Sequence, residues 1–152
     1  MQIRVLGPVE VLVDGHALPL LAAGERELLA LLALAAGRVV AVPALIDALW
    51  GEQLPSNPGN ALQVRVSKLR RALTTAGLDD LLLTRPPGYL LDVDPMSVDA
   101  LRFADLVAAA RAAAGIDPAA VARHYREALG LWRGTRWRSS RKRGGPGRRR
   151  PD

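Results

Sequence analysis

The sequence predicts an α+β protein: a small N-terminal antiparallel sheet, three helices and a second hairpin, followed by an all-α helical hairpin and a disordered basic tail. Three observations support this expectation. Short β-branched runs near the N-terminus are joined by Asp14-Gly15, which is a strong hairpin signal. A helix over 58–76 is marked by capping residues at both ends. Ala-rich helical periodicity begins after Asp94-Pro95 and ends near Arg133.

The N-terminal part of the chain contains strand and helix signals in turn. Residues 3–20 consist of short apolar runs broken by turns, so we expect an antiparallel sheet there. Residues 25–36 form a predicted helix that is apolar on nearly every face, as buried helices are, and Gly37 follows as its C-terminal cap. A short second helix is expected from Pro43 to Trp50, closed by Gly51.

The third predicted helix, residues 58–76, has an apolar face and a polar face. Asn57 suits the N-cap and Pro58 the first helical position, and Gly77 lies just past the end. With about 100° between successive residues, one set of apolar side chains shares a face, which we expect to be buried: Leu62, Val66, Leu69 and Leu73. The opposite face carries Asn60, Val64, Ser67, Lys68, Arg71 and Thr75, while Arg65 and Arg70 flank the apolar stripe.

A hairpin follows this helix, with apolar strands at 81–84 and 89–93 around the turn Arg85-Pro86-Pro87-Gly88. A short helix, a loop, a capped basic helix and a hairpin with a cation at its tip together make a winged helix. In such a domain the third helix enters the major groove, where Lys and Arg reach guanine or phosphate, Asn pairs with adenine, and Val meets a thymine methyl. Arg85 is then the cation that probes the minor groove.

Charge is concentrated in two places. The net charge is +6, but nine basic residues and one acid lie from Arg133 onward, which leaves twelve basic and fourteen acidic residues in 1–132. Five of those twelve lie within about twenty positions of one another: Arg65, Lys68, Arg70, Arg71 and Arg85. A local basic cluster on an acidic domain indicates nucleic-acid binding better than overall charge does.

Other features exclude several classes of protein. The absence of cysteine rules out disulfides and thiolate metal sites, and the longest apolar run, Leu28–Ala36, is about half of a membrane span. His16 and His124 have no partner at ligand spacing, so we expect a turn residue and a helix-surface residue. Trp50 and Trp132 are expected to anchor apolar cores. No Walker loop, nucleophile elbow or metal motif occurs. We therefore expect a cytoplasmic, nucleoid-associated protein that is no enzyme, with no cofactor, no metal and no membrane contact.

The last third of the chain divides into a helical part and a tail. Residues 98–114 and 118–132 predict two helices, and we expect Val121, Tyr125, Ala128 and Trp132 to form a packed stripe on the second. Arg, Gly, Ser and Pro dominate afterwards, so this segment should be disordered. The predicted units are a winged helix at 1–96, a helical segment at 97–134 and a basic tail at 135–152.

Four segments, in this order, resemble the Streptomyces antibiotic regulatory protein family: Ile3–Val11, Ala48–Gly51, Asn60–Leu73 and Thr84–Leu91. The resemblance covers about residues 1–132. It implies an OmpR-type winged helix followed by a bacterial transcriptional activation domain of tetratricopeptide-like helices, whose start resembles Val98–Phe103. It also implies activation of antibiotic and other secondary-metabolite gene clusters, through double-stranded DNA direct repeats near promoters and contact with RNA polymerase.

The resemblance also implies which residues touch DNA. Positions that read bases or contact phosphates in OmpR-type helices match Val64, Arg65, Ser67, Lys68 and Arg70, and the wing cation matches Arg85. The helical wheel agrees on Val64, Ser67 and Lys68 but ranks Arg71 above Arg70. Both arginines are retained, so the predicted DNA-binding residues are Asn60, Val64, Arg65, Ser67, Lys68, Arg70, Arg71 and Arg85.

Several alternatives stay open at this stage. The family continues for further helical pairs, whereas this chain runs from Gly134 into Arg, Gly and Pro, so we expect an activation domain truncated by a shortened or shifted reading frame. A basic arm that binds phosphates is the competing interpretation. The rival functions are a helical protein-interaction adaptor built on 98–132 and nonspecific nucleic-acid binding by the tail. Activation or repression, the operator, the regulated pathway and dimerisation on DNA are left undecided.

Overall fold

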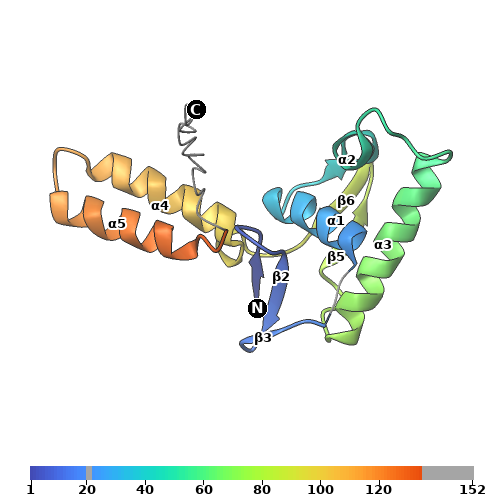
Figure 1. Ribbon diagram of the computed structural model, residues 1–152, viewed down its shortest axis with the longest axis horizontal. Helices are drawn as coiled ribbons and strands as arrows, with labels where there is room; N and C mark the ends of the chain where they lie inside the picture. Colours follow the sequence, from blue (N-terminus) through green and yellow to red (C-terminus); the bar gives the residue numbers. More distant parts are fainter. Residues whose placement is uncertain (20–21, 135–152) are drawn as a thin grey trace, which may run out of the picture.

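The computed structural model describes residues 1–19 and 22–134. The chain forms a winged-helix unit and a helical hairpin, which lie on opposite sides of the N-terminal sheet (Figure 1). The basic tail at 135–152, expected to be disordered, lies outside the described residues. The predicted fold class is confirmed.

The N-terminal sheet consists of β1 (Gln2–Arg4), β2 (Glu10–Val13) and β3 (His16–Ala17), antiparallel in that order. Val13 pairs with His16, so Asp14 and Gly15 alone form the loop. Both have positive φ, 50° and 80°, which is the geometry of a type I′ hairpin turn and the reason that Asp-Gly is favoured there. The predicted hairpin is confirmed, and His16 lies at its turn, with its Nδ1 2.9 Å from the carbonyl oxygen of Asp14.

Three helices follow: α1 (Ala23–Leu34), α2 (Val42–Trp50) and α3 (Pro58–Thr75). Their bounds differ by one or two residues from those predicted, which is within the usual spread at helix ends. α1 contributes Leu28, Leu29 and Leu32 to the core, all fully buried. The Asn57 side chain caps α3 by accepting a hydrogen bond from the Asn60 backbone N–H at 3.1 Å, as the sequence predicts.

The wing is a three-stranded sheet in the order β4-β6-β5, made of β4 (Val40–Ala41), β5 (Leu82–Arg85) and β6 (Gly88–Leu91). The β5–β6 hairpin was predicted. β4 was not, because two paired residues between helices give too short a pattern to recognise. Gly88 lies opposite Ala41, and a Cβ atom on it would lie 1.8 Å from the Val40 carbonyl oxygen, so only glycine fits there.

After the short 3-10 turn η1 (Pro95–Ser97), the helices α4 (Asp99–Ala113) and α5 (Pro118–Leu131) pack antiparallel on each other. The Asp117 side chain caps α5 through the Ala120 N–H at 3.0 Å. The expected packed stripe on α5 is wrong in part: Ala128 is buried, but Tyr125 is 40% exposed and Trp132 53% exposed. Among the described elements, α5 packs on α4, and its other face is exposed within residues 1–19 and 22–134. Trp132 is therefore not the core anchor that the sequence predicts.

Two other side chains can be compared with their expected settings. Trp50 is partly buried and packs against the winged-helix core, as expected. His124, expected on the helix surface, is half-buried instead, and its Nδ1 is enclosed without a hydrogen-bond partner in the described structure.

Asp99, the first residue of α4, and Arg133, which follows α5, join the helical hairpin to the N-terminal sheet. The buried Asp99 carboxylate accepts hydrogen bonds from the backbone N–H groups of Val5 (2.7 Å) and Leu6 (3.1 Å). The Arg133 guanidinium donates to the Glu10 carboxylate and to the Pro8 carbonyl, each at 3.0 Å.

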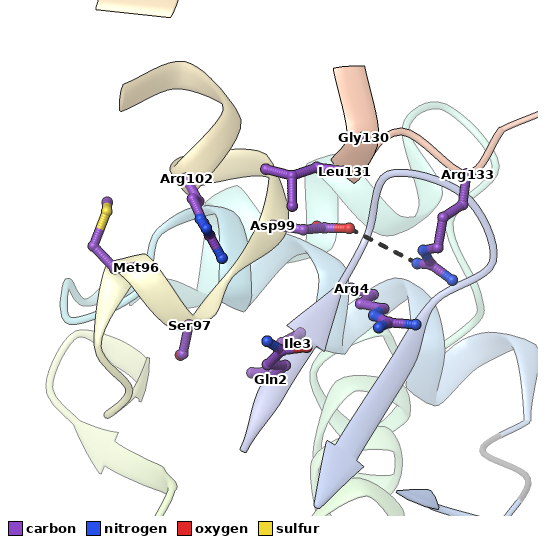
Figure 2. Close-up of a pocket in the computed structure, with 10 residues that line it drawn as sticks. All are labelled: Gln2, Ile3, Arg4, Met96, Ser97, Asp99, Arg102, Gly130, Leu131 and Arg133. Carbon is purple, nitrogen blue, oxygen red and sulfur yellow. Dashed lines mark ion pairs between the residues drawn. The ribbon is translucent and has the colours of Figure 1, made fainter. Parts of the chain in front are cut away.

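Figure 2 shows the Asp99 carboxylate and the Arg133 guanidinium facing each other. The two groups are 3.8 Å apart, and both residues line a cavity of about 210 Å³. Additional contacts come from the backbone, where the Arg133 N–H donates to the Leu6 carbonyl at 2.9 Å and Ile3 forms a parallel bridge with Val98. The start of α4 and the residue after α5 thus both form hydrogen bonds with the loop between β1 and β2.

We predict that Leu69→Ala lowers the free energy of unfolding by about 2–5 kcal/mol, because Leu69 is fully buried in the middle of α3 and its truncation leaves a cavity. Denaturant melts of the two proteins measure the difference. Thr74→Ala, at an exposed position of the same helix, is the control and should change stability by less than about 0.5 kcal/mol. Equal stability of the Leu69 variant and the parent would show that Leu69 does not lie on the buried face of α3.

We predict that Arg133→Ala loosens the helical hairpin, because it removes the contacts to Glu10 and Pro8 and leaves the Asp99 carboxylate without its cation. A loss of about 1–3 kcal/mol is expected for hydrogen bonds to charged groups. Hydrogen exchange of the α4 and α5 amides should speed up relative to those of α3. Arg123→Ala, on the exposed face of α5, is the matched control. Unchanged exchange in the Arg133 variant would contradict the role given to this side chain.

Candidate nucleic-acid interface

The orientation of α3 is set by its apolar stripe. Leu62, Val66, Leu69 and Leu73 are all buried, each at most 2% exposed, as the helical wheel predicts. The opposite face is exposed to solvent, and six of its side chains line a shallow depression of about 410 Å³: Asn60, Gln63, Val64, Ser67, Lys68 and Arg71. Five of these six were predicted as DNA-binding residues, and the structure brings them together on one surface.

Gln63 is the residue that the sequence argument missed. It lies about a quarter turn from the centre of the buried face, at the border where the wheel does not decide between burial and exposure. In the structure it is exposed and joins the outer face. Its amide carries both a donor and an acceptor, the combination that pairs with adenine in the major groove.

The outer face combines groups of different chemistry. Asn60 and Gln63 offer amides, Ser67 a hydroxyl, and Lys68 and Arg71 positive charges. Val64, an apolar side chain outside the buried core cluster, is 45% exposed among them. Base edges present donors, acceptors and methyl groups at the floor of the major groove, so such a mixture suits direct reading of a duplex.

Arg65 is bound within the protein. Its Nη1 donates to the Glu27 carboxylate at 3.1 Å, and its guanidinium lies 4.6 Å from the ring centroid of Trp50. The side chain is only 23% exposed and also covers Gly24, where a Cβ would lie 3.0 Å from the Arg65 Nε. Arg65 thus connects α3 to α1 and α2.

Arg70 makes the equivalent connection to the wing. Its Nε donates to the Leu82 carbonyl at 3.1 Å and its Nη2 to the Thr84 hydroxyl at 2.7 Å, and the guanidinium lies 5.9 Å from the Tyr89 ring centroid. Lys68 and Arg71 differ from Arg65 and Arg70. Within residues 1–19 and 22–134 neither side chain donates a hydrogen bond or forms a salt bridge, and both residues are exposed. This placement agrees with the wheel, which ranked Arg71 above Arg70.

Arg85 lies at the end of β5, where the wing turns. Its Nη1 donates to the Thr84 carbonyl at 3.0 Å, and the residue is exposed. Arg85 is thus an exposed cation beside the turn of the hairpin, where the sequence places it.

The described part of the chain contains no group of three side chains able to hold a metal ion. No helix in 1–19 or 22–134 has both the length and the apolar character needed to cross a bilayer.

Comparison with known proteins places the chain among transcription regulators. Residues 17–91 match the family model described as "Transcriptional regulatory protein, C terminal". The chain is similar to the regulatory protein DnrI of Streptomyces peucetius, with 41% identity over 143 residues, covering 88% of this chain and 52% of DnrI. It is also similar to the transcriptional regulator RedD of Streptomyces coelicolor, with 36% identity over 138 residues, covering 88% of this chain and 39% of RedD. The chain thus spans about half, or less, of these relatives.

A solved structure shares the fold. The chain superimposes on Mycobacterium tuberculosis EmbR in complex with a low-affinity phosphopeptide, with a TM-score of 0.76 and 38% identity, over 88% of this chain and 36% of EmbR. The match in sequence and in fold extends over the winged helix and the helical hairpin together. The chain therefore belongs to the Streptomyces antibiotic regulatory protein family of transcriptional regulators, which have an OmpR-type winged helix.

Proposed function

We propose that this chain is a sequence-specific, double-stranded DNA-binding regulator that inserts α3 into the major groove and the wing at 85–88 into the minor groove. The observation that carries the proposal is the outer face of α3, where cations, amides, a hydroxyl and an exposed Val64 share one surface. This face is backed by a fully packed apolar stripe, which holds it in a defined orientation. Defined orientation is what base reading requires, because a bidentate contact tolerates little displacement.

The predicted DNA-binding residues take two different roles in this proposal. Asn60, Val64, Ser67, Lys68 and Arg71, together with Gln63, face the duplex and contact base edges or phosphates. Arg65 and Arg70 act as positioning residues instead, because their guanidinium groups are engaged by α1, α2 and the wing. Arg85 contacts the phosphate backbone or the minor groove from the tip of the wing.

The family suggests where such a protein acts. We propose that the targets are direct repeats at promoters of secondary-metabolite gene clusters in the nucleoid, with RNA polymerase as a partner and binding as a dimer on the two repeats. The relatives DnrI and RedD, both named as regulators from Streptomyces, support this assignment.

A protein-interaction role for the helical hairpin is the second candidate function. The exposed apolar side chains of α5 favour it, because Leu129 is 69% exposed and Trp132 also faces solvent. A mobility-shift assay in a salt series separates the two candidates. A DNA binder loses affinity steeply as salt rises, whereas an adaptor gives no salt-dependent shift.

We predict that Lys68→Ala weakens binding to a selected duplex by about 1–3 kcal/mol, with no change in melting temperature, because Lys68 is exposed and forms no salt bridge with the described residues. Mobility-shift titrations against the selected duplex and a random one measure the effect. Arg111→Ala, an exposed basic residue on α4, is the charge-matched control. An equal loss on both duplexes would restrict Lys68 to phosphate contact, and no loss would remove it from the interface.

We predict that Arg85→Ala reduces affinity for selected and random duplexes by the same factor and lowers the slope of log affinity against log salt by about 1, because one phosphate contact is lost. Base preference, measured by selection from a random library, should stay as in the parent. Affinity equal to that of the parent at every salt concentration would exclude the wing from the interface.

A further inference from the structure

A second groove adjoins the DNA-facing surface of α3. It lies between the N-terminal sheet and the C-terminal half of α3 and has a volume of about 580 Å³. Figure 1 shows β3 at the same end of the molecule as the C-terminal end of α3. Apolar side chains dominate the described lining: Val13, Ala17, Leu18 and Pro19 on one side, and Ala72 and Ala76 on the other.

Two cations stand at one side of this groove. Lys68 and Arg71 line it, and the same two side chains also line the depression on the outer face of α3. No acidic residue occurs in the described lining, and neither cation forms a salt bridge within the described residues. The groove therefore combines an apolar floor with uncompensated positive charge at a single edge.

We propose that this groove binds a small amphipathic organic acid, whose apolar body packs against Leu18 and Ala72 and whose carboxylate pairs with Lys68 and Arg71. The volume falls in the range of small-molecule pockets, about 300–1,000 Å³. Burial of the apolar body is favourable, and a carboxylate forms charge-assisted hydrogen bonds with ammonium and guanidinium groups. A neutral compound leaves both cations without a partner, and an amine is repelled by them.

The shared cations give this site a regulatory consequence. A bound carboxylate engages Lys68 and Arg71, the side chains that we assign to the duplex, so the ligand and DNA compete for the same charges. Because coupling between two sites is reciprocal, DNA must weaken ligand binding by the same factor. This consequence rests on the proposed DNA-binding function, whereas the ligand site itself does not.

The binding test uses 2-naphthoate as the probe and 2-naphthalenemethanol as its neutral counterpart, titrated into the whole chain and followed by amide shifts in ¹H–¹⁵N spectra. We expect saturable binding of the acid, with the largest shifts at residues 16–19 and 68–76, and binding of the alcohol weaker by about threefold to tenfold. Equal binding of the two compounds, or shifts centred on the exposed apolar face of α5, would overturn the proposal.

Two substitutions by tryptophan locate the site. Ala17→Trp fills the groove from an exposed position on β3 and should abolish naphthoate binding while leaving DNA affinity unchanged. Ala108→Trp, at an exposed position of α4, is the matched control and should bind naphthoate as the parent does. Absence of acid binding by the parent chain would overturn the proposal.

The competition test measures DNA affinity at a naphthoate concentration that fills most sites, against sodium acetate at the same ionic strength. We expect naphthoate to raise the Kd for the selected duplex by about fivefold or more, since two DNA-facing cations are withdrawn, and acetate to have no such effect. The Ala17→Trp variant should be insensitive to naphthoate. Naphthoate binding without any effect on DNA affinity would overturn the regulatory coupling. A chain that binds naphthoate but no DNA would overturn the proposed function and leave the ligand site standing.

Discussion

The packing of one apolar stripe of α3 against α1 and the wing is the constraint on which the rest of the structure depends. Leu62 and Leu69 lie in the same buried cluster as Leu28 and Leu32 of α1. Once these side chains are buried, the rotation of α3 about its axis is decided, because neighbouring positions are separated by about 100°. The identity of the outward-facing residues is therefore a consequence of hydrophobic burial and needs no separate cause.

The rotation of α3 separates its basic residues into two groups, one that contacts other parts of the protein and one that is exposed to solvent. Arginines at the border of the apolar stripe lay their aliphatic stems along the domain and direct the guanidinium to an inner partner. Arg65 meets Glu27 and the Trp50 ring, and Arg70 meets the backbone and a hydroxyl of the wing. Lys68 and Arg71, nearer the centre of the outer face, meet no such partner in the described structure. A count of basic residues therefore overstates the number of cations that α3 presents without an inner partner among the described residues.

The sequence alone predicted the features that depend on local periodicity and capping, and missed those that depend on distant pairs. The apolar positions of α3, the Asn57 cap and the Asp14-Gly15 turn are local, and the structure confirms all three. β4 is too short to leave a pattern, and its pairing with β6 joins segments far apart in the chain. The inner partners of Arg65 and Arg70 likewise lie on other elements. The exposure of Trp132 was not predicted, because helical periodicity identifies a face but not whether a neighbouring element covers it.

The hydrogen bonds of Asp99 with the loop after β1 limit where the chain can be cut between the winged helix and the helical hairpin. Excision of the winged helix at the predicted boundary, residue 96, leaves the backbone N–H groups of Val5 and Leu6 without the carboxylate that accepts from them, and leaves Ile3 without its bridge to Val98. β1 then becomes an open edge strand, and such edges invite pairing between molecules. The winged helix and the helical hairpin are therefore not structurally independent of each other. A change of partner for either one in the course of evolution has to carry the first turn of α4 along with the winged helix.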